Sequence, residues 1–362
     1  MKMKEKPIIV MDLATTGKGG GPYTSTSRIM ESDLKNRYLF KTLHYKTELG
    51  FGISISRIVD LVQQLKKLNP DIVHFGGLQL SGFHIAIACK YARIKNTIVT
   101  IHGSSGDMID FNPIKKYLLK YILEPLTLLL SNQIICVSDY VASKNIVKLF
   151  SYKDIKIIYN IPPNSNEFPD IPSFRDELYL KPSDVVVVSV GRINKEKGYH
   201  ILTKAIKNSS NITKLKYVIV GAGDYLKEMK EILKEQILNK QVFFMGYRKD
   251  IQGILSSCDI FSLPTLHETL SIALLEASVA GLPLIASDTG GVPEIVKDNY
   301  NGFLVSPGNA GELFDRISIL YASPELRKEF GENAHNNIAL KFSHNSIVGK
   351  IDRVYQSILH LE

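Results

Sequence analysis

Short apolar runs of β type alternate with amphipathic helical stretches along nearly the whole chain. In the first half the apolar runs are PIIVMDL, YLFKTLHY, DIVHFGG, NTIVTIHG, QIICVS and IKIIYN. Between them lie stretches such as SRIVDLVQQLKKLN, whose apolar residues recur at helical spacing. Strands that alternate with helices are typical of βαβ units, so this half is predicted to form a parallel sheet covered by helices.

The same alternation restarts after a proline-rich segment. NIPPNSNEFPDIPS, residues 160–173, contains four prolines and no periodicity, and it predicts a linker. Beyond it, six further runs predict strands: DVVVVSVGR, KYVIVGAG, QVFFMGY, DIFSLPT, PLIAS and GFLVS. Ser323 followed by Pro324 predicts the start of a helix, because serine is a good N-cap and proline suits the first helical position.

The two halves therefore predict two doubly wound, Rossmann-like α/β domains. We place the first at residues 1–163 and the second at residues 174–342. Residues 343–362 are expected to form a helix that packs back towards the first domain. In such folds the ligand lies beyond the carboxyl ends of the strands, so we expect the substrate site in a cleft between the domains.

Composition indicates a globular chain. Apolar residues make up 44% and charged residues 22%, and no apolar run approaches the roughly 18 residues that cross a bilayer. The N-terminal apolar run PIIVM is stopped by Asp12, which favours a first strand over a signal peptide. Cys89, Cys136 and Cys258 are scattered, which indicates reduced thiols and argues against a zinc site. We therefore expect a cytoplasmic protein.

Positive charge is concentrated in the first half. Residues 1–165 hold 22 Lys and Arg against 12 Asp and Glu, whereas the remainder holds 22 against 24. This balance favours an anionic partner, although a solvated lysine-rich surface gives the same count. KKYLLKYILEPLTLLL, residues 115–130, suits a helix that rests on an anionic membrane, and it equally suits a core helix. Nucleic-acid binding is not expected, because no motif combines basic with aromatic residues.

A basic loop follows the first predicted strand of the second half. In VGRINKEKG, Gly191 and Arg192 end the strand, and Lys197 and Gly198 precede a helix. Arginine offers a planar fork and lysine a compact charge, a combination that suits a diphosphate. A solvated loop with fortuitous charges is the alternative.

The stretch HETLSIALLE places two carboxylates, Glu268 and Glu276, at the ends of an apolar run. With Thr269 or Ser271 as the cap of a helix, eight helical residues would separate them by roughly 12 Å. That is about the distance between the sugar and the ribose of an extended nucleotide-sugar, and amides near Leu270 and Ser271 would face the diphosphate. Alternatively both glutamates are structural, which the cost of burying a carboxylate makes less favourable for Glu276.

Glycines and one histidine also fall at strand ends. SDTGGVPEIV contains Gly290 and Gly291, and TTGKGGGPYTS contains Gly19 to Gly21, where the backbone could approach a ligand closely. VGAGD lacks the third glycine of a dinucleotide fingerprint. His102 ends the strand in TIHGSSGD, where it is expected to point into the cleft, unless its role is structural.

In combination and in order, these motifs resemble the retaining GT-B glycosyltransferases of glycosyltransferase family 4. The resemblance covers nearly the whole chain and implies a GT-B fold, with an N-terminal acceptor domain and a C-terminal donor domain. It assigns Arg192 and Lys197 to the diphosphate, Glu268 to the transferred sugar and Glu276 to the ribose. The other positions that it implies in the site are Gly20, Gly21, His102, Gly191, Leu270, Ser271, Gly290 and Gly291.

One departure from the family pattern concerns the donor sugar. Many members have glycine after the first glutamate and a small residue or proline near position 271, whereas this chain reads Glu268-Thr269-Leu270-Ser271. The departure bears on which sugar is transferred more than on the activity.

The resemblance implies transfer of a sugar from a nucleotide-diphosphate-sugar, with retention of configuration. A glycan or polyprenyl-diphosphate-linked acceptor in bacterial surface polysaccharide synthesis (capsule or O-antigen) would fit, with the protein peripheral on the inner face of the membrane. No cofactor is expected, because the nucleotide-sugar is a co-substrate. No metal is expected either, because the sequence contains no D-x-D.

Three other functions are less favoured. An NAD-dependent dehydrogenase would need G-x-G-x-x-G after the first strand, which GKGGGPYTS does not supply. A nucleotide-sugar epimerase of the same architecture would need acid and base carboxylates across the cleft in place of the basic loop. A catalytically silent sugar-binding subunit is disfavoured because Arg192, Lys197, Glu268 and Glu276 are all present.

Overall fold

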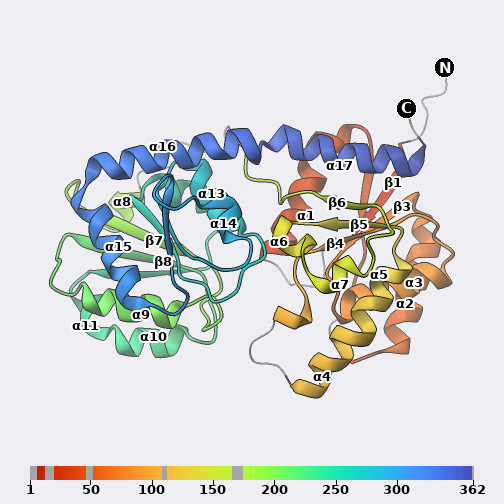
Figure 1. The fold of residues 1–362 in the computed structure, drawn as a ribbon, viewed down its shortest axis with the longest axis horizontal. Helices are drawn as coiled ribbons and strands as arrows, with labels where there is room; N and C mark the ends of the chain where they lie inside the picture. Colours follow the sequence, from red (N-terminus) through yellow and green to blue (C-terminus); the bar gives the residue numbers. More distant parts are fainter. Residues whose placement is uncertain (1–5, 13–19, 46–51, 108–111, 165–173, 361–362) are drawn as a thin grey trace. The chain divides into compact units, whose positions relative to one another are not determined.

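The structure is a computed structural model that describes residues 6–12, 20–45, 52–107, 112–164 and 174–360. The chain divides into two units (Figure 1). Unit 1 comprises residues 1–161 and 345–362, and unit 2 comprises residues 162–344. Gly19 and most of the predicted linker, residues 165–173, lie outside the described residues.

Unit 1 is built on a six-stranded parallel sheet in the order β2-β1-β3-β4-β5-β6. Its inner strands are buried on both faces, as their continuous apolar sequences predict. The strands are β1 (Ile8–Met11), β2 (Leu39–Thr42), β3 (Ile72–Gly76), β4 (Thr97–Ile101), β5 (Gln133–Cys136) and β6 (Ile155–Ile157).

Helices cover the two faces of this sheet (Figure 1). The last helix of the chain, α17, lies on one face, and α2, α3 and α5 lie on the other, where α3 packs against both α2 and α5. The helical segments are α1 (Gly21–Glu31), η1 (Asp33–Asn36), α2 (Ile55–Leu68), α3 (Leu80–Tyr91), η3 (Ser105–Asp107), α4 (Pro113–Leu118), η4 (Leu119–Leu123), α5 (Glu124–Leu130), α6 (Asp139–Ala142), α7 (Asn145–Lys148) and α17 (His344–Leu359).

Polar contacts join α17 to the sheet of unit 1. Tyr355 is fully buried, and its hydroxyl lies 2.8 Å from His74 Nδ1. The other ring nitrogen of His74 lies 2.7 Å from Thr100 Oγ1. Asp352 accepts a hydrogen bond from the Tyr38 hydroxyl at 2.7 Å and pairs with Arg37. A helix at the end of the chain thus completes the domain formed by its beginning.

The helical path from α4 to α5 contains a turn of π-helix. Pro125 lacks an N–H, so the carbonyl of Tyr121 loses its usual helical donor. The chain widens at η4, where the N–H of Glu124 donates to the carbonyl of Leu119, five residues earlier. Because the helix continues through the turn, α4, η4 and α5 form one amphipathic rod.

Unit 2 repeats the architecture with a parallel sheet in the order β12-β11-β10-β7-β8-β9. Its strands are β7 (Val185–Val190), β8 (Leu215–Val220), β9 (Val242–Gly246), β10 (Ile260–Leu263), β11 (Leu284–Ser287) and β12 (Gly302–Val305). The two sheets confirm the two doubly wound parallel-sheet domains predicted from the sequence.

Helices flank the sheet of unit 2, with α9 to α11 on one side and α13 and α16 on the other (Figure 1). The predicted helix start is confirmed, since Ser323 caps α16 by accepting from the N–H of Leu326, and Pro324 is its first residue. The helices are α8 (Phe174–Glu177), α9 (Tyr199–Asn208), α10 (Leu226–Ile232), α11 (Lys234–Leu238), α12 (Ile251–Ser256), α13 (Ile272–Val279), α14 (Val292–Ile295), α15 (Ala310–Ala322) and α16 (Pro324–Lys341).

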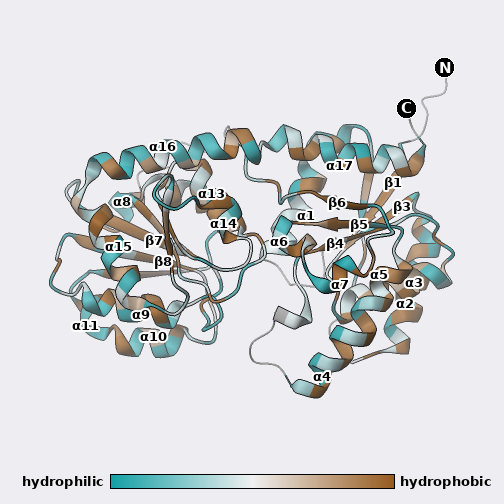
Figure 2. Cartoon of the chain, in the orientation of Figure 1, coloured by the Kyte–Doolittle hydropathy of each residue, from teal (hydrophilic) through white to brown (hydrophobic). Residues whose placement is uncertain are grey.

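The cores lie between the sheets and their helices. Hydrophobic colouring follows the strands of both sheets, whereas the outer helices alternate between hydrophilic and hydrophobic residues (Figure 2). Cys89, Cys136 and Cys258 are buried as free thiols. Among the helices that the structure describes, none combines the length and the apolar character needed to cross a bilayer.

Candidate functional site

The candidate site in unit 2 lies where the direction of strand order reverses. The chain proceeds from β7 outward through β8 and β9, then returns to the other side of β7 for β10, β11 and β12. The loops that follow β7 and β10 therefore leave adjacent strands at the same edge of the sheet, where open α/β sheets bind their ligands. The first carries Arg192 and Lys197, and the second carries Glu268.

The loop after β7 fixes the backbone of Lys197. Its N–H donates to Asn194 Oδ1 at 2.9 Å. The next residue, Gly198, has φ +75°, and a Cβ there would lie 1.7 Å from the carbonyl oxygen of Pro264. Only glycine fits this contact, so the loop after β7 is held directly against the end of β10. Arg192 is exposed on the same loop.

Further hydrogen bonds connect the two loops. The carbonyl of Glu196 accepts from the N–H of Leu266 at 2.9 Å and from Thr265 Oγ1 at 3.3 Å. Thr265 also donates to the carbonyl of His267 at 2.8 Å and is fully buried. The sequence reasoning missed Asn194 and Thr265. Their position at the end of a strand, beside the basic and acidic motifs, was the available signal.

An ion pair joins the two predicted functional groups of this edge. Lys197 Nζ lies 2.8 Å from Glu268 Oε2, and the two side chains are 27% and 11% exposed. Glu268 Oε1 also accepts from the N–H of Thr269 at 3.2 Å. The sequence assigned Lys197 and Glu268 to different parts of a ligand, and in this structure they bind each other.

The helix after Glu268 begins at the later of the two predicted caps. α13 starts at Ile272, because the Ser271 hydroxyl accepts from the N–H of Leu274 at 3.2 Å and caps it. Residues from Glu268 to Ser271 are not helical, so the eight helical residues from which the separation of roughly 12 Å was estimated are not present. The amides of Leu270 and Ser271 precede the first turn and do not belong to it.

The second glutamate is a buried helix residue. Glu276 lies in α13 and is only 8% exposed. The helix ends after it in a left-handed Gly281, where Leu282 N–H donates to the carbonyl of Ala277 at 3.0 Å. With both ends of α13 fixed, Glu276 occupies a defined position in the domain.

A third loop, after β11, packs against the first glutamate. The N–H of Gly291 donates to the carbonyl of Glu268 at 3.1 Å. A Cβ on Gly291 would lie 1.8 Å from the carbonyl oxygen of Thr269, and Gly290 has φ +56°. The structure therefore brings Gly290 and Gly291 next to the peptide of Glu268, so they serve at least to hold that residue.

The VGAGD glycines have a packing role. A Cβ on Gly221 would lie 1.9 Å from the carbonyl oxygen of Gly191, and one on Gly223 would lie 2.2 Å from that of Ile193. They allow the loop after β8 to approach the loop after β7. This explains the glycines without a dinucleotide.

The predicted histidine of unit 1 follows β4 and lies over the end of β3. A Cβ on Gly76 would lie 3.3 Å from His102 Cδ2. Burial lowers the pKa of His102 to about 4, so its imidazole is neutral at pH 7. The N–H of Ser105, three residues on, donates to Glu124 Oε1 at 2.5 Å, and both residues are fully buried.

The first-loop glycines of unit 1 lie at a helix start. Gly20, with φ +102°, precedes α1, and Gly21 is its first residue. Gly20 is followed by Pro22 in the first turn, a residue that suits this position. Thus Gly20, Gly21 and His102 belong to unit 1, and the other predicted site residues belong to unit 2.

Sequence comparisons match both halves of the chain to sugar-transfer families. The model described as glycosyl transferases group 1 matches residues 170–337, and the model described as glycosyltransferase family 4 matches residues 16–161. The matches cover both units, and the chain belongs to glycosyltransferase family 4. It is a glycosyltransferase of GT-B fold.

Curated relatives are similar over most of their length. The chain is 28% identical over 314 residues to N,N'-diacetylbacillosaminyl-diphospho-undecaprenol alpha-1,3-N-acetylgalactosaminyltransferase of Campylobacter jejuni, covering 83% of this chain and 80% of the relative. It is 27% identical over 307 residues to UDP-Gal:alpha-D-GlcNAc-diphosphoundecaprenol alpha-1,3-galactosyltransferase of Escherichia coli, covering 82% and 77%.

A solved structure shares the fold over nearly its whole length. Anabaena Alr3699/HepE in complex with UDP and glucose has a TM-score of 0.78 at 22% identity, covering 98% of this chain and 100% of that one.

Proposed function

We propose that this glycosyltransferase moves a sugar from a nucleotide-diphosphate-sugar to a glycan or polyprenyl-diphosphate-linked acceptor in bacterial surface polysaccharide synthesis. The observation that carries the proposal is the convergence of Arg192, Lys197, Glu268 and the start of α13 at the switch point of unit 2. The names of the Campylobacter and Escherichia relatives, both of which describe transfer to a diphospho-undecaprenol-linked sugar, support the acceptor class.

The proposed reaction retains the anomeric configuration. The bond between the anomeric carbon and the diphosphate oxygen breaks, and its electron pair leaves with the diphosphate. The acceptor hydroxyl forms the new glycosidic bond on the same face, and its proton passes to a phosphate oxygen. The products are the glycosylated acceptor and the nucleoside diphosphate.

The proposed roles follow from the charges of the side chains. Arg192 and Lys197 stabilise the negative charge that develops on the diphosphate, without a metal ion or another cofactor. Glu268 faces the transferred sugar, Glu276 accepts from the ribose hydroxyls, and neutral His102 contacts the sugar. Gly20, Gly21, Gly191, Leu270, Ser271, Gly290 and Gly291 would line the donor.

A ligand panel tests the donor class. Thermal unfolding is measured with UDP, GDP, ADP and their sugar conjugates, and at least one nucleoside diphosphate is expected to raise the melting temperature, because a ligand of the native state stabilises it. UDP comes first because the Escherichia relative is named for UDP-Gal. If no nucleoside diphosphate shifts the transition, the donor assignment is wrong.

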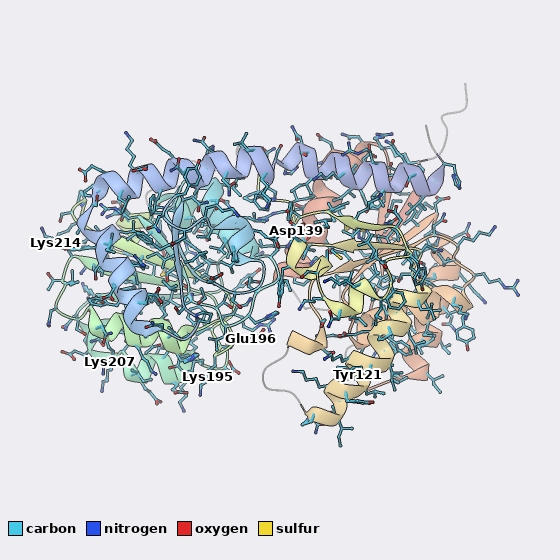
Figure 3. All side chains as sticks on the ribbon, in the orientation of Figure 1. Tyr121, Asp139, Lys195, Glu196, Lys207 and Lys214 are labelled. Atoms are coloured by element: carbon cyan, nitrogen blue, oxygen red, sulfur yellow. The ribbon has the colours of Figure 1, made fainter. Side chains whose placement is uncertain are left out.

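We also propose that unit 1 docks on the inner face of an anionic membrane, through the rod of α4, η4 and α5. Its inward side is buried through Leu119, Leu123 and Leu128. Its outward side exposes large apolar side chains, including Ile114 at 81%, and Tyr121 lies on this segment (Figure 3). The other exposed apolar residues are Tyr117, Leu118, Ile122, Leu126 and Leu129.

Lysines on the same surface support an anionic bilayer as the proposed partner. Lys115 and Lys120 lie on the same rod as the tyrosines, and Lys120 Nζ lies 4.9 Å from the ring centre of Tyr121. Aromatic, aliphatic and lysine side chains together match the boundary between lipid headgroups and acyl chains. α4 follows β4 in the chain, and His102 lies at the end of β4.

Flotation with phosphatidylcholine vesicles, with and without phosphatidylglycerol, tests this surface. The variant Tyr117→Ser with Tyr121→Ser and Ile122→Ser is expected to bind anionic vesicles at least about tenfold more weakly. The matched control replaces Lys66, Lys67 and Lys90 with glutamate, because they are exposed in unit 1 at the ends of α2 and α3. The docking proposal is wrong if the wild type fails to bind anionic vesicles at low salt.

A further inference from the structure

Binding a diphosphate needs cations only, yet Lys197 is paired with the carboxylate of Glu268. Lys197 Nζ lies 2.8 Å from a carboxylate oxygen of Glu268, and both side chains are partly buried. Asn194 and Gly198 fix the backbone of Lys197, and Gly291 fixes that of Glu268. The loops thus fix the two backbones within reach of each other, whereas the side chains of Lys197 and Glu268 keep their own rotamers and can change partner.

A bound diphosphate must compete with Glu268 for this lysine. The carboxylate neutralises Lys197 and also repels a nearby anion, so both effects weaken binding of a nucleoside diphosphate. A complete donor differs from the spent nucleotide in two respects. It carries one negative charge fewer on the diphosphate, and its sugar hydroxyls can donate to the carboxylate in place of Lys197.

We propose that Glu268 distinguishes the sugar donor from the spent nucleoside diphosphate by exchanging Lys197 for a sugar hydroxyl. When the donor binds, Lys197 turns to the diphosphate and Glu268 accepts from the sugar. After transfer the nucleoside diphosphate carries no sugar hydroxyl that could donate to Glu268. Glu268 therefore pairs with Lys197 again. Glu268 thereby promotes release of the product, in addition to the contact with the sugar. This inference rests on the proposed function and deepens it.

Calorimetric titration of UDP and of a UDP-sugar tests the inference, with GDP or ADP substituted if that nucleotide gives the larger thermal shift. Glu268→Gln is expected to bind the nucleoside diphosphate about fivefold more tightly, the gain of one modest ion-pair interaction. Its affinity for the nucleotide-sugar is expected to stay the same or fall, and its turnover to fall. A residue with a merely structural role would weaken binding of both ligands.

Glu196→Gln is the matched control. Glu196 precedes Lys197 on the same loop (Figure 3), and its carboxylate has no hydrogen bond or ion pair within the described part of the chain. The Glu196→Gln variant removes the same charge without releasing Lys197. Its effect on the affinity for the nucleoside diphosphate is therefore expected to stay below about twofold. In the Lys197→Ala background, Glu268→Gln is expected to give a smaller gain, because only the repulsion between Glu268 and the diphosphate is then relieved. Circular dichroism checks folding, and Glu268→Asp, too short to hold Lys197, replaces Glu268→Gln if that variant does not fold.

The outcomes separate the inference from the proposed function. If the wild type binds a nucleoside diphosphate and Glu268→Gln binds it no more tightly, or gains no more than Glu196→Gln, the exchange is wrong and the donor site stands. If the wild type binds no nucleoside diphosphate, the proposed function fails, and the exchange fails with it.

Discussion

The two units have the same parallel sheet with helices on both faces, yet they differ in the ionisable groups that their folds hold. Unit 2 keeps ionised side chains near its sheet edges and pairs them: Lys197 with Glu268, and Arg248 with Glu177 at 2.7 Å. Unit 1 buries neutral imidazoles, and burial lowers the pKa of His74 to about 3 and that of His84 to about 4. Lysines of unit 1 such as Lys115 and Lys120 are exposed.

This difference shows how one architecture supports two tasks. Paired charges in a loop can change partner when an anionic ligand arrives, which suits the donor side. In unit 1 the buried histidines are neutral, and the exposed apolar side chains of α4 and η4 lie on the surface beside lysines. Substitutions and acid in the two units test this division of tasks.

Removing a cation from unit 2 tests whether its charges serve the reaction. Arg192→Ala and Lys197→Ala are each expected to lower the transfer rate by about 10² to 10³, the usual loss when one preorganised donor to a developing anion is removed. Steady-state kinetics with the donor checks this. Lys195→Ala, an exposed lysine of the same loop that lies over the Tyr225 ring, should stay within about fivefold of wild type. Comparable losses in all three variants would contradict a specific clamp.

Backbone packing between the loops of unit 2 gives the next effect. Gly198→Ala is expected to lower the free energy of unfolding by about 3 kcal/mol, because its Cβ collides with the Pro264 carbonyl and its φ is positive. Gly308→Ala has a similar φ of +87° with open space around it, so about 1 kcal/mol is expected. Calorimetric unfolding measures the difference, which isolates the collision. Equal losses would mean that the loops can separate.

The buried imidazoles should make unit 1 the more acid-sensitive half. His74 has a pKa of about 3 when folded and an ordinary value near 6.5 when unfolded, so the unfolded state binds more protons between these values. Its contribution is complete above pH 6.5 and is lost as pH falls, by about 2 kcal/mol at pH 5.

Hydrogen exchange at pH 7 and pH 5, corrected for intrinsic rates, compares the units. Protection of β3 and β4 should fall more than protection of β7 and β8, and His74→Asn should reduce the slope in unit 1. An equal loss of protection in both units would show that unit 1 is not the more acid-sensitive half.

Helix capping gives the smallest effect and connects stability with binding. Ser271→Ala and Ser323→Ala each remove a cap whose hydroxyl accepts a backbone N–H, and each should cost about 1 kcal/mol of unfolding free energy. Only Ser271→Ala should also raise the KM for the donor, because Ser271 starts α13 in the donor site. If neither variant changes KM, the start of α13 does not contact the ligand.

The sheets could be predicted from sequence because each strand carries its own signal. DIVHFGG and DVVVVSVGR are short apolar runs ended by glycine, and each contains a strand of the structure, β3 and β7. The signal for the start of α16 was equally local, since the cap Ser323 and the first helical residue Pro324 are adjacent. The start of α13 was left open between two residues, because Thr269 and Ser271 are both good caps and only the structure shows that Ser271 is used.

The site residues were identified by type, but their contacts could not be predicted. Lys197 and Glu268 lie 71 positions apart, and no local pattern indicates that they pair. The contact of Gly198 with Pro264 depends on the order of β7 and β10 in the sheet, which the sequence does not specify. The π turn at η4 has a local cause, because Pro125 lacks an N–H. Its register, however, depends on which side of the rod is buried.

The contact between Tyr355 and His74 has a consequence for synthesis of the chain. The two residues lie 281 positions apart, yet both belong to unit 1. Unit 2 lies entirely between them, so a ribosome completes all of unit 2 before it releases the helix that covers His74. The domain that is translated first is therefore the last to gain its final helix, and a nascent chain must keep that face of the β1–β6 sheet uncovered until then.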